Sequence, residues 1–303
     1  MGTPDFAVPI LEMLIENTNV LLVVTQPDKE VGRHHEVMFS PIKKVAREHN
    51  IEVFQPNSIR NDYERILSMN ADIIITCAYG QIIPEAILTN PRLGCINVHA
   101  SLLPKLRGGA PIHHALIDGL KKTGVTIMYM DKSMDTGDII STKEYVIKDT
   151  DNVGILHDTL SVMGRDLLLE TLPDIINGTN KRIPQDNALA TYGYNITREE
   201  EHIDFNRSAI EVYNQIRGLS PWPLANAKIN GVEVKILDCF IGDKDSNLSS
   251  GTICEINKDN IGICTKDKII YITKVKPFGK NVMNALDYIN GLNKEKVLHT
   301  IAE

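Results

Sequence analysis

The sequence predicts an α/β protein in which a Rossmann-like, doubly wound, mostly parallel sheet is followed by a small OB-like β-barrel. In the first half, short β-branched runs alternate with amphipathic helical stretches, which is the pattern of a parallel sheet covered by helices. In the last third, short strand-like runs follow one another closely. A length of 303 residues also exceeds the usual size of one domain. We therefore expect a first domain over residues 1–180, a linker over 181–199 and a second domain over 200–303.

Six runs rich in β-branched residues are the strand candidates of the first domain: residues 20–25, 51–54, 72–77, 94–99, 125–130 and 139–147. A helix begins near Thr3 and Pro4, since Phe6, Ile10 and Leu14 then share one face. In a doubly wound sheet such a helix normally follows the first, central strand. No strand-like run precedes it here, so we expect a sheet whose first strand is missing.

A long helix and a segment without periodicity follow the last of these strands. The helical period covers residues 153–177, with Pro173 inside it and Gly178 as its stop. Residues 179–199 have no sustained period, which indicates a linker on the surface.

Turn signals organise the second domain. Ser208 and Glu211 form a capping box that predicts the start of a helix. Asn230 and Gly231 stand between two apolar runs and predict a two-residue hairpin. Further short strands are expected at residues 252–256, 261–265 and 269–275, and together they suggest the barrel.

Composition excludes several classes of protein. The five cysteines are odd in number and never occur as CxxC, which argues against a disulfide framework and against a zinc site. No apolar stretch approaches the roughly 20 residues that span a bilayer. We therefore expect a cytoplasmic protein without a membrane partner.

Charge is distributed unevenly along the chain. The formal net charge is −7, which at first sight discourages a nucleic-acid partner. Thirteen basic and thirteen acidic residues follow Glu200, so the net charge lies entirely in the first 200 residues. The last third can therefore carry a basic face.

Asn97 and His99 stand two residues apart at the end of a predicted strand, so both side chains point from the same face. Ligands of open α/β sheets bind at the carboxyl ends of the strands. An amide donor beside an imidazole suits a carbonyl oxygen that becomes an oxyanion. Asp135, in a tight turn after the next strand, could orient the imidazole or relay a proton. Each of the three could instead be a structural residue satisfied by loop backbone.

The motifs NVHASLLP (residues 97–104), RGGAPI (107–112) and DTG (135–137) together resemble the signature of the formyltransferases that use 10-formyltetrahydrofolate. Within that family, GTPDF (2–6), TQPD (25–28) and the C-terminal barrel are similar to the members that act on initiator methionyl-tRNA. The resemblance covers essentially the full length. It implies formyl transfer from 10-formyltetrahydrofolate, and folate and initiator methionyl-tRNA as partners.

The resemblance also implies roles for particular residues. Catalysis falls to Asn97, His99 and Asp135, and folate binding to Ser101, Leu102, Leu103 and Pro104 and to the wall that contains Tyr79, Gly80 and Gln81. The methionyl amine would attack the formyl carbon, Asn97 and His99 would bind the oxyanion, and Asp135 would help to move the proton. This chemistry requires no metal.

The tRNA-binding residues are expected in two places. The inserted loop after TQPD is usually lysine-rich in this family, whereas here it keeps Arg33, with Lys43 and Lys44 further on. We therefore expect this loop to bind the tRNA more weakly than is usual in the family. In the predicted barrel, four lysines are separated by even numbers of residues and would line one face if that stretch is extended: Lys266, Lys268, Lys274 and Lys276. Such a face suits RNA phosphates, although a solvated strand face has the same pattern.

Two alternatives stay open. A formyltransferase or formyltetrahydrofolate hydrolase acting on a small molecule would share the three catalytic residues without needing the basic face. A folate-binding or RNA-binding protein that has lost catalysis is the other alternative, against which the presence of Asn97, His99 and Asp135 argues. We expect a monomer in either case.

Overall fold

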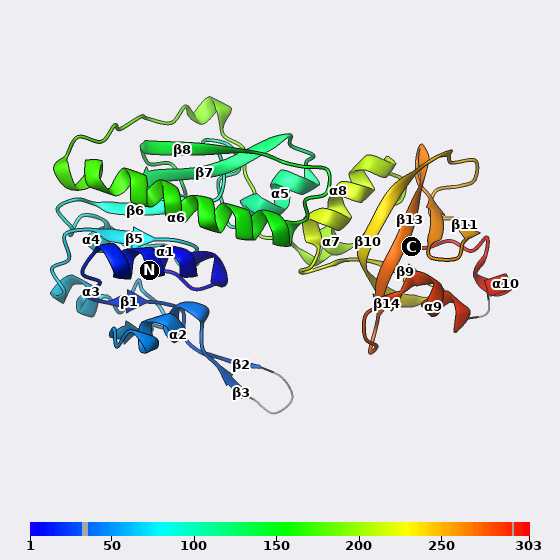
Figure 1. Cartoon of the computed structure of the whole chain (residues 1–303), viewed down its shortest axis with the longest axis horizontal. Helices are drawn as coiled ribbons and strands as arrows, with labels where there is room; N and C mark the ends of the chain where they lie inside the picture. Colours follow the sequence, from blue (N-terminus) through cyan, green and yellow to red (C-terminus); the bar gives the residue numbers. More distant parts are fainter. Residues whose placement is uncertain (32–35, 293) are drawn as a thin grey trace. The chain divides into compact units, whose positions relative to one another are not determined.

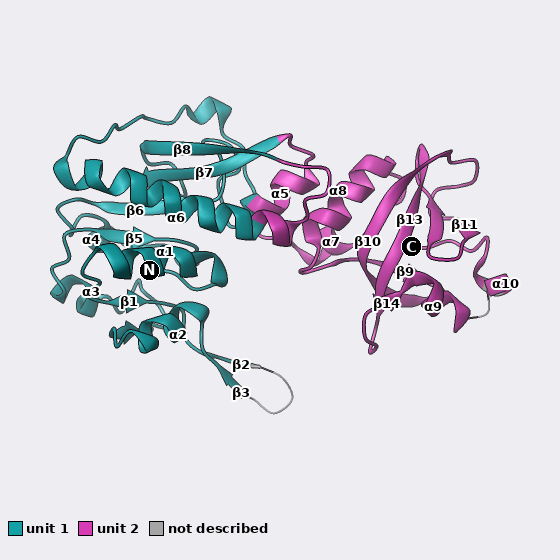
Figure 2. Ribbon diagram, in the orientation of Figure 1, with its two compact units in different colours: residues 1–111, 122–146, 157–194 teal, residues 112–121, 147–156, 195–303 magenta. Residues whose placement is uncertain are grey.

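A computed structural model of the chain describes residues 1–31, 36–292 and 294–303. The chain divides into two compact units (Figure 2). Unit 1 contains residues 1–111, 122–146 and 157–194, and unit 2 contains residues 112–121, 147–156 and 195–303. Unit 1 is a mixed α/β structure, whereas unit 2 is mostly antiparallel β structure.

The main sheet of unit 1 has four strands in the order β5-β6-β7-β8 (Figure 1). These strands are β5 (Ile74–Thr76), β6 (Cys95–His99), β7 (Lys122–Tyr129) and β8 (Ile139–Val146). Two shorter strands, β1 (Val23–Val24) and β4 (Val53–Phe54), form a separate parallel pair. All six lie within or next to the runs that the β-branched pattern predicted.

The expectation of a mostly parallel sheet is wrong for the second half of this sheet. Strand β6 runs parallel to β5, but β7 runs antiparallel to both β6 and β8. Strands β7 and β8 are joined directly, without a crossover helix, and such a hairpin connection can join only antiparallel strands. The buried apolar pattern of β7 does not reveal this direction, because a buried strand has the same pattern in either orientation.

Met1 and Gly2 lie where a first, central strand of the sheet would run. The Gly2 N–H donates to the carbonyl oxygen of Val24 at 3.0 Å, and the Cys77 N–H donates to that of Met1 at 2.9 Å. Gly2 and Cys77 form a parallel bridge. The two halves of the sheet are thus linked through Met1 and Gly2, next to the carboxyl ends of β1 and β5.

Helices and a small hairpin complete unit 1. The hairpin consists of β2 (Lys29–Val31) and β3 (Glu36–Met38), in a segment that the sequence indicated only as a loop. The helices are η1 (Asp5–Ala7), α1 (Val8–Asn17), α2 (Pro41–Glu48), α3 (Glu64–Ser68), α4 (Glu85–Leu88), α6 (Val153–Asn177), which begins in unit 2, and η2 (Asn187–Leu189). The predicted bounds of α6 are confirmed, including Pro173 inside it and Gly178 at φ +68° after it.

Helix α6 packs closely against the strand that carries Asn97 and His99. A Cβ atom on Gly164 would lie 2.9 Å from Cγ1 of Val98 and 3.5 Å from Cγ1 of Val125. Val98 is buried and alternates with Asn97 and His99 along β6. The helix therefore holds one face of β6, which leaves the opposite face for the polar pair.

Unit 2 is built around one six-stranded antiparallel sheet in the order β11-β12-β13-β10-β9, with β14 paired to β13. Its strands are β9 (Ala225–Ile229), β10 (Val232–Asp245), β11 (Ile253–Ile256), β12 (Ile261–Cys264), β13 (Lys268–Pro277) and β14 (Met283–Asn284). Its helices are α5 (Pro111–Ile117), α7 (Arg198–Glu201), α8 (Ala209–Leu219), α9 (Ala285–Asn290) and α10 (Lys294–Val297). Both predicted local signals are confirmed, namely the Ser208–Glu211 capping box and the Asn230-Gly231 hairpin, whose turn residues have φ +52° and +73°.

Strand pairing does not close this sheet into a barrel among the residues that the structure describes. The outer strands are β9 and β11, and no ladder joins them. Several backbone hydrogen bonds join the C-terminal residues to both outer strands instead. The Ile253 N–H donates to the carbonyl of Thr300 at 2.9 Å, and the Glu303 N–H donates to that of Lys228 at 3.0 Å. These C-terminal residues lie outside the strands, which is why periodicity could not reveal their hydrogen bonds.

In the described part of the chain, no helix has both the length and the apolar character that a bilayer span requires.

Candidate functional site

The carboxyl end of β6 presents Asn97 and His99 on one face, as their spacing predicted. Asn97 is half-buried, and His99 is only 6% exposed. Asn97 pairs with Thr76 of β5 and Met128 of β7, and His99 pairs with Thr126 of β7. A polar pair is thus held on a rigid strand instead of a loop.

Thr76 orients the side chain of Asn97. The two residues are register partners in the parallel β5–β6 ladder, and Oγ1 of Thr76 lies 2.8 Å from Oδ1 of Asn97. Thr76 is almost fully buried. The same hydroxyl also lies 3.2 Å from the carbonyl oxygen of Ile96 and 3.0 Å from Sδ of Met130, and Oδ1 of Asn97 is the nearest of the three acceptors. When the single hydroxyl hydrogen is donated to Oδ1, the amide group directs its Nδ2 hydrogens away from β5. Sequence reasoning missed Thr76, for which the only signal was a hydroxyl residue near the end of an aliphatic strand.

A backbone carbonyl fixes the ring of His99. Its Nε2 lies 3.0 Å from the carbonyl oxygen of Leu106, which can only accept, so Nε2 carries a hydrogen. The other ring nitrogen, Nδ1, lies 3.7 Å from Oδ1 of Asp135. The structure therefore brings together the three residues that the sequence singled out, but the distance between Nδ1 and Asp135 exceeds that of a hydrogen bond.

Asp135 is held in an unusual backbone conformation. Its φ is +56°, a region that costs energy for any residue with a Cβ and that persists only where the surroundings enforce it. Its Oδ2 accepts a hydrogen bond from the Gly108 N–H at 2.8 Å. Two residues later, a Cβ on Gly137 would lie 1.9 Å from the carbonyl oxygen of Tyr129, so only glycine fits in this turn.

The side chain of Gln185 forms hydrogen bonds with the turn that contains Asp135. Its Nε2 donates to the carbonyl oxygens of Asp135 at 2.9 Å and Gly137 at 2.8 Å. Its Oε1 accepts from Nε of Arg107 at 3.2 Å and from Nη2 at 2.8 Å. Arg107 is 2% exposed and also donates to Asn187 at 2.9 Å. All four hydrogen-bonding positions of one amide are therefore used to join the Asp135 turn to the loop after β6.

The segment around Gln185 is part of unit 1 and is hydrogen-bonded to its neighbours at several positions. Arg107 exchanges backbone hydrogen bonds with Thr191 and Gly193 at 2.9 and 2.8 Å, and Ile183 pairs with Ile139. Sequence reasoning missed Gln185 because residues 179–199 have no periodicity, and nothing local connects this glutamine to a turn 50 positions earlier.

The residues of the expected pterin wall present mainly backbone. Tyr79 is buried, and burial raises its pKa to about 12. The carbonyl oxygen of Tyr79 accepts hydrogen bonds from Gln26 and Thr3, and Oε1 of Gln81 accepts one from the Ile59 N–H at 2.9 Å. The side chain of Gln81 is thus engaged in hydrogen bonds, whereas that of Tyr79 packs in the core with its hydroxyl unpaired among the described residues. Gly80, at φ +86°, is exposed and leaves its backbone accessible.

The loop Ser101–Leu102–Leu103–Pro104 is anchored by Thr126 of β7. The Thr126 hydroxyl donates to the Ser101 carbonyl at 2.7 Å and accepts from the Leu103 N–H at 3.2 Å. Ser101 and Leu103 are buried, whereas Leu102 and Pro104 are half-buried. The last two therefore have side-chain surface that a ligand can contact.

The basic residues expected near the inserted loop differ in their surroundings. Arg33 lies outside the described residues. Lys43 forms an ion pair with Asp28 and lies 4.2 Å from the centre of the Phe39 ring, while Lys44 is exposed. Burial opposes ionisation of Asp28, but hydrogen bonds from Lys43 and Gln55 hold its pKa below the ordinary value. The charge of Lys43 is therefore already compensated within the fold.

The four lysines of the second unit do not share one face. The β10–β13 register passes from Asp238–Lys274 to Cys239–Ile272, which skips Thr273 and makes a bulge. Lys274 and Lys276 are exposed on either side of buried Val275. Before the bulge, the even-numbered positions are those of Ile270 and Ile272, whose side chains are buried. Lys266 lies in the preceding turn, and Lys268 is half-buried. A bulge reverses the alternation of a strand, so the parity argument holds only for Lys274 and Lys276.

Among the described residues, no group of three or more His, Cys, Asp or Glu side chains is arranged to hold a metal ion.

Sequence comparison relates both units to known proteins. Residues 1–172 match the formyl transferase family, and residues 195–293 match the formyl transferase C-terminal domain. The chain is 50% identical over 300 residues to a methionyl-tRNA formyltransferase of Staphylococcus epidermidis, covering 98% of this chain and 96% of that protein. It is 48% identical over 294 residues to the methionyl-tRNA formyltransferase of Staphylococcus aureus, covering 96% and 94%.

Two solved structures share the fold at lower identity. The N-formyltransferase from Helicobacter canadensis, in complex with folinic acid and dTDP-3-aminofucose, superposes with a TM-score of 0.67 at 22% identity, over 90% of this chain and 97% of that one. The sugar 3N-formyltransferase WlaRD, with dTDP and 5-N-formyl-THF, gives 0.65 at 22% identity over 92% and 97%.

The four hydrogen bonds of the Gln185 side chain lead to a testable prediction. Gln185→Ala leaves two carbonyl oxygens and part of a buried guanidinium without partners, so we expect the free energy of unfolding to fall by about 2–3 kcal/mol. Urea unfolding followed by far-ultraviolet circular dichroism measures it. Asn180→Ala, which removes a half-exposed amide from the same segment, should change the value by less than about 0.5 kcal/mol. Equal losses in the two variants would contradict a special role for Gln185.

Proposed function

The chain belongs to the formyl transferase family, and on this premise we propose that it transfers the formyl group of 10-formyltetrahydrofolate to the amino group of methionine on initiator tRNA. The observation that carries this function is the 48–50% identity to methionyl-tRNA formyltransferases over nearly the whole of both chains. The product is formylmethionyl-tRNA, with which translation begins. The three residues at the end of β6 and in the turn before β8 supply the chemistry.

Asn97, through Nδ2, and His99, in its doubly protonated form through Nδ1–H, bind the oxygen of the formyl group as it gains charge, because Nε2–H of His99 is already donated to the Leu106 carbonyl. The amine nitrogen attacks the formyl carbon, and the C=O bond opens to an oxyanion. Thr76 holds the Asn97 amide so that Nδ2 donates in one direction, and the Leu106 carbonyl holds the imidazole ring. Donors fixed before the reaction stabilise the developing charge without reorganisation.

Asp135 moves the proton. The attacking amine loses one proton as the new C–N bond forms, and N10 of the folate gains one as the old C–N bond breaks. The carboxylate lies 3.7 Å from Nδ1 of His99, close enough for the two groups to act on the same reacting atoms. Its turn is fixed through Gly108 and Gln185, so the carboxylate keeps its position during the transfer.

The folate is bound by backbone on one side and by loop side chains on the other. We assign Tyr79, Gly80 and Gln81 to the pterin wall, where the exposed backbone at Gly80 allows close approach of a flat ring. Leu102 and Pro104 contact the folate through their side chains, and Ser101 and Leu103 through their backbone, since both of the latter side chains are buried.

The tRNA is bound by both units. In unit 1 the contacts come from the segment between β2 and β3, which includes Arg33, and from Lys44, with Lys43 as a minor contributor because of its ion pair with Asp28. In unit 2 the main contacts are Lys274 and Lys276, with Lys266 and Lys268 at a separate place.

The proposal also assigns the two domains, the linker between them, the oligomeric state and the cellular location. The first domain, residues 1–180, is Rossmann-like, and the second domain, residues 200–303, is OB-like. Residues 181–199 are the linker, of which residues 181–194 pack as part of unit 1. We propose that the protein acts as a monomer in the cytoplasm, where aminoacylated tRNA is available.

The central experiment compares acceptors. The chain is incubated with labelled 10-formyltetrahydrofolate and with methionyl-tRNA, free methionine or an amino sugar nucleotide, and formyl incorporation is followed. We expect transfer to methionyl-tRNA alone. Transfer to none of them, or equally to all, would refute the proposed substrate.

His99→Ala should separate chemistry from binding. Loss of the imidazole removes one oxyanion donor, so kcat should fall by about 100-fold or more. The pterin wall is on other elements, and the Kd for the folate should stay within about twofold. Loss of folate binding together with turnover would instead make His99 part of the folate site.

Thr76→Val tests the orientation of Asn97. Without the hydroxyl the amide can rotate, so we expect kcat to fall by about tenfold while the KM for the folate changes little. Thr123→Val is the matched control, because the Thr123 hydroxyl is buried and has no partner among the described residues. It should leave kcat unchanged; a similar loss in both variants would assign the effect of Thr76→Val to packing.

The two lysine pairs of unit 2 should differ in their electrostatic effect. Each phosphate contact that is lost reduces the slope of log Kd against log salt by about 0.7–0.9, so changing Lys274 and Lys276 to Ala should lower it by about 1–2. Changing Lys266 and Lys268 to Ala removes the same charge on the other side of the bulge and should have a smaller effect. An unchanged slope in the first variant would exclude Lys274 and Lys276 from the contact surface.

A further inference from the structure

Two tyrosines of unit 1 form an exposed aromatic stack. The ring centres of Tyr192 and Tyr194 are 5.4 Å apart, and the planes of the two rings are within 5° of parallel. Tyr192 is 46% exposed and Tyr194 is 59% exposed, which is unusual for side chains that carry so much apolar surface. Each ring covers one face of the other, so the outer faces of the stack are left for a further flat ring. The steps of formyl transfer use neither tyrosine.

The residues that alternate with these tyrosines hold the loop that positions the catalytic groups. The hydroxyl of Thr191 accepts a hydrogen bond from the Leu106 N–H at 2.9 Å, and the Leu106 carbonyl binds the ring of His99. Gly193 packs so closely on Gly108 that a Cβ on Gly108 would lie 2.8 Å from the Gly193 carbonyl oxygen. The Gly108 N–H is the donor that binds the catalytic carboxylate. The backbone that carries the stack therefore contacts the supports of both catalytic groups.

An exposed lysine lies in the loop beside the same segment. The Thr191 N–H donates to the carbonyl oxygen of Pro104 at 3.4 Å, and Lys105 is the next residue of that loop. Lys105 is exposed and forms no ion pair within the described part of the chain, unlike Lys43, whose charge is compensated by Asp28. Proteins bind single-stranded nucleic acid with this combination, in which a cation contacts the phosphate and an aromatic ring stacks on the base.

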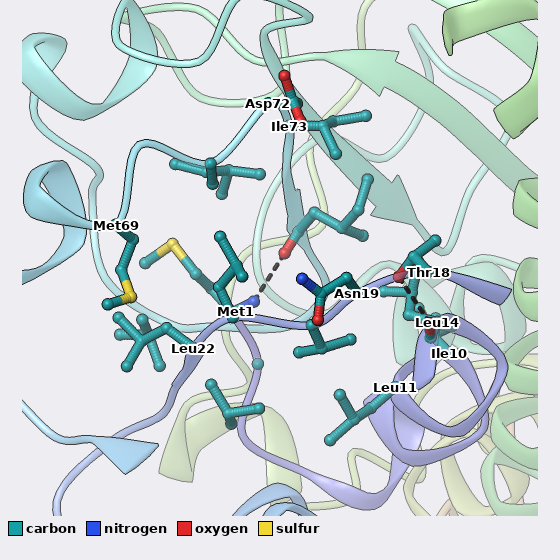
Figure 3. A pocket seen from close by; sticks show the side chains of 18 of the residues that line it. Met1, Ile10, Leu11, Leu14, Thr18, Asn19, Leu22, Met69, Asp72 and Ile73 are labelled. Atoms are coloured by element: carbon teal, nitrogen blue, oxygen red, sulfur yellow. Dashed lines mark hydrogen bonds between the residues drawn. The ribbon is translucent and has the colours of Figure 1, made fainter. Parts of the chain in front are cut away.

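A cavity of about 380 Å³ in unit 1 offers a different kind of surface (Figure 3). Its lining is mostly aliphatic, with residues such as Ile10 and Leu11, and none of the described residues that line it is aromatic. Its two charged residues, Asp72 and Arg92, pair with each other at 2.7 Å. The cavity therefore has neither a ring for a base nor an uncompensated cation for a phosphate, whereas the tyrosine stack and its neighbouring lysine supply both.

The substrate of the proposed reaction brings a flat ring to this loop. In an aminoacyl-tRNA, the amino acid is an ester of the 3′-terminal ribose, so the attacking amine and the terminal base belong to one nucleoside ester. When the amine reaches Asp135, the base must lie among the loops that surround the site. The 3′ end of a tRNA is single-stranded, and an unpaired base stacks readily on an aromatic side chain.

We propose that Tyr192 and Tyr194 bind the 3′-terminal base of methionyl-tRNA and that Lys105 binds a phosphate of the same unpaired end. The base stacks on the outer face of Tyr194, the more exposed ring, and Tyr192 supports that ring from its other face. Stacking holds the nucleoside equally in the bound substrate and in the transition state, so it contributes to KM and not to kcat. This assignment rests on the proposed formyl transfer to methionyl-tRNA and adds the place of the last nucleotide.

The test combines a change in the chain with a change in the substrate. Tyr194→Ala removes the stacking surface, so the KM for methionyl-tRNA should rise about tenfold, while kcat and the KM for the folate stay within about twofold. Tyr194→Phe keeps the ring and should recover most of this loss. A methionyl-tRNA whose 3′-terminal nucleotide lacks its base should show the same tenfold loss with the unchanged chain. With Tyr194→Ala, this abasic substrate should show no additional loss, because both changes remove one contact.

Two further variants separate stacking from charge and from general effects on the segment. Lys105→Ala should lower the slope of log Kd for methionyl-tRNA against log salt by about 0.7, whereas Tyr194→Ala should leave that slope unchanged. Leu189→Ala removes an exposed apolar side chain from the same segment and should leave every KM unchanged.

The outcomes distinguish this assignment from the reaction on which it rests. If the unchanged chain formylates methionyl-tRNA but the losses from Tyr194→Ala and from the missing base multiply, the stacking assignment is wrong and formyl transfer stands. A raised KM for the folate in Tyr194→Ala or Lys105→Ala would place these residues in the folate site instead. No transfer to intact methionyl-tRNA by the unchanged chain would refute the proposed function, and this assignment with it.

Discussion

The parallel pairing of β5 with β6 is the constraint on which the site depends. It places Thr76 opposite Asn97, so that a buried hydroxyl on one strand fixes the side-chain amide on the next. The alternation of β6 then puts His99 on the same face and Val98 on the other, where α6 approaches closely enough to require glycine at position 164. A shift of one residue in this register would turn both polar side chains into the helix-covered face.

The loops around this strand are fixed by hydrogen bonds that come from distant parts of the chain. Leu106 holds the ring of His99 through a carbonyl oxygen, and Gly108 holds the carboxylate of Asp135 through an N–H. Gln185 joins the turn that contains Asp135 to the buried guanidinium of Arg107. The unfavourable φ of Asp135 is maintained by these contacts, and a preorganised carboxylate is what a proton relay requires.

The sequence by itself determined the elements whose signals are local. The bounds of α6, the capping box at Ser208, the Asn230-Gly231 hairpin and the positions of β1 and of β4 to β8 follow from periodicity and turn chemistry over a few residues. The shared face of Asn97 and His99 follows from their spacing. Tertiary structure alone decided the direction of β7, the bulge at Thr273, and the partners of Asn97 and Asp135. The reason is that these features depend on contacts between residues far apart in the sequence, where neither spacing nor periodicity carries information.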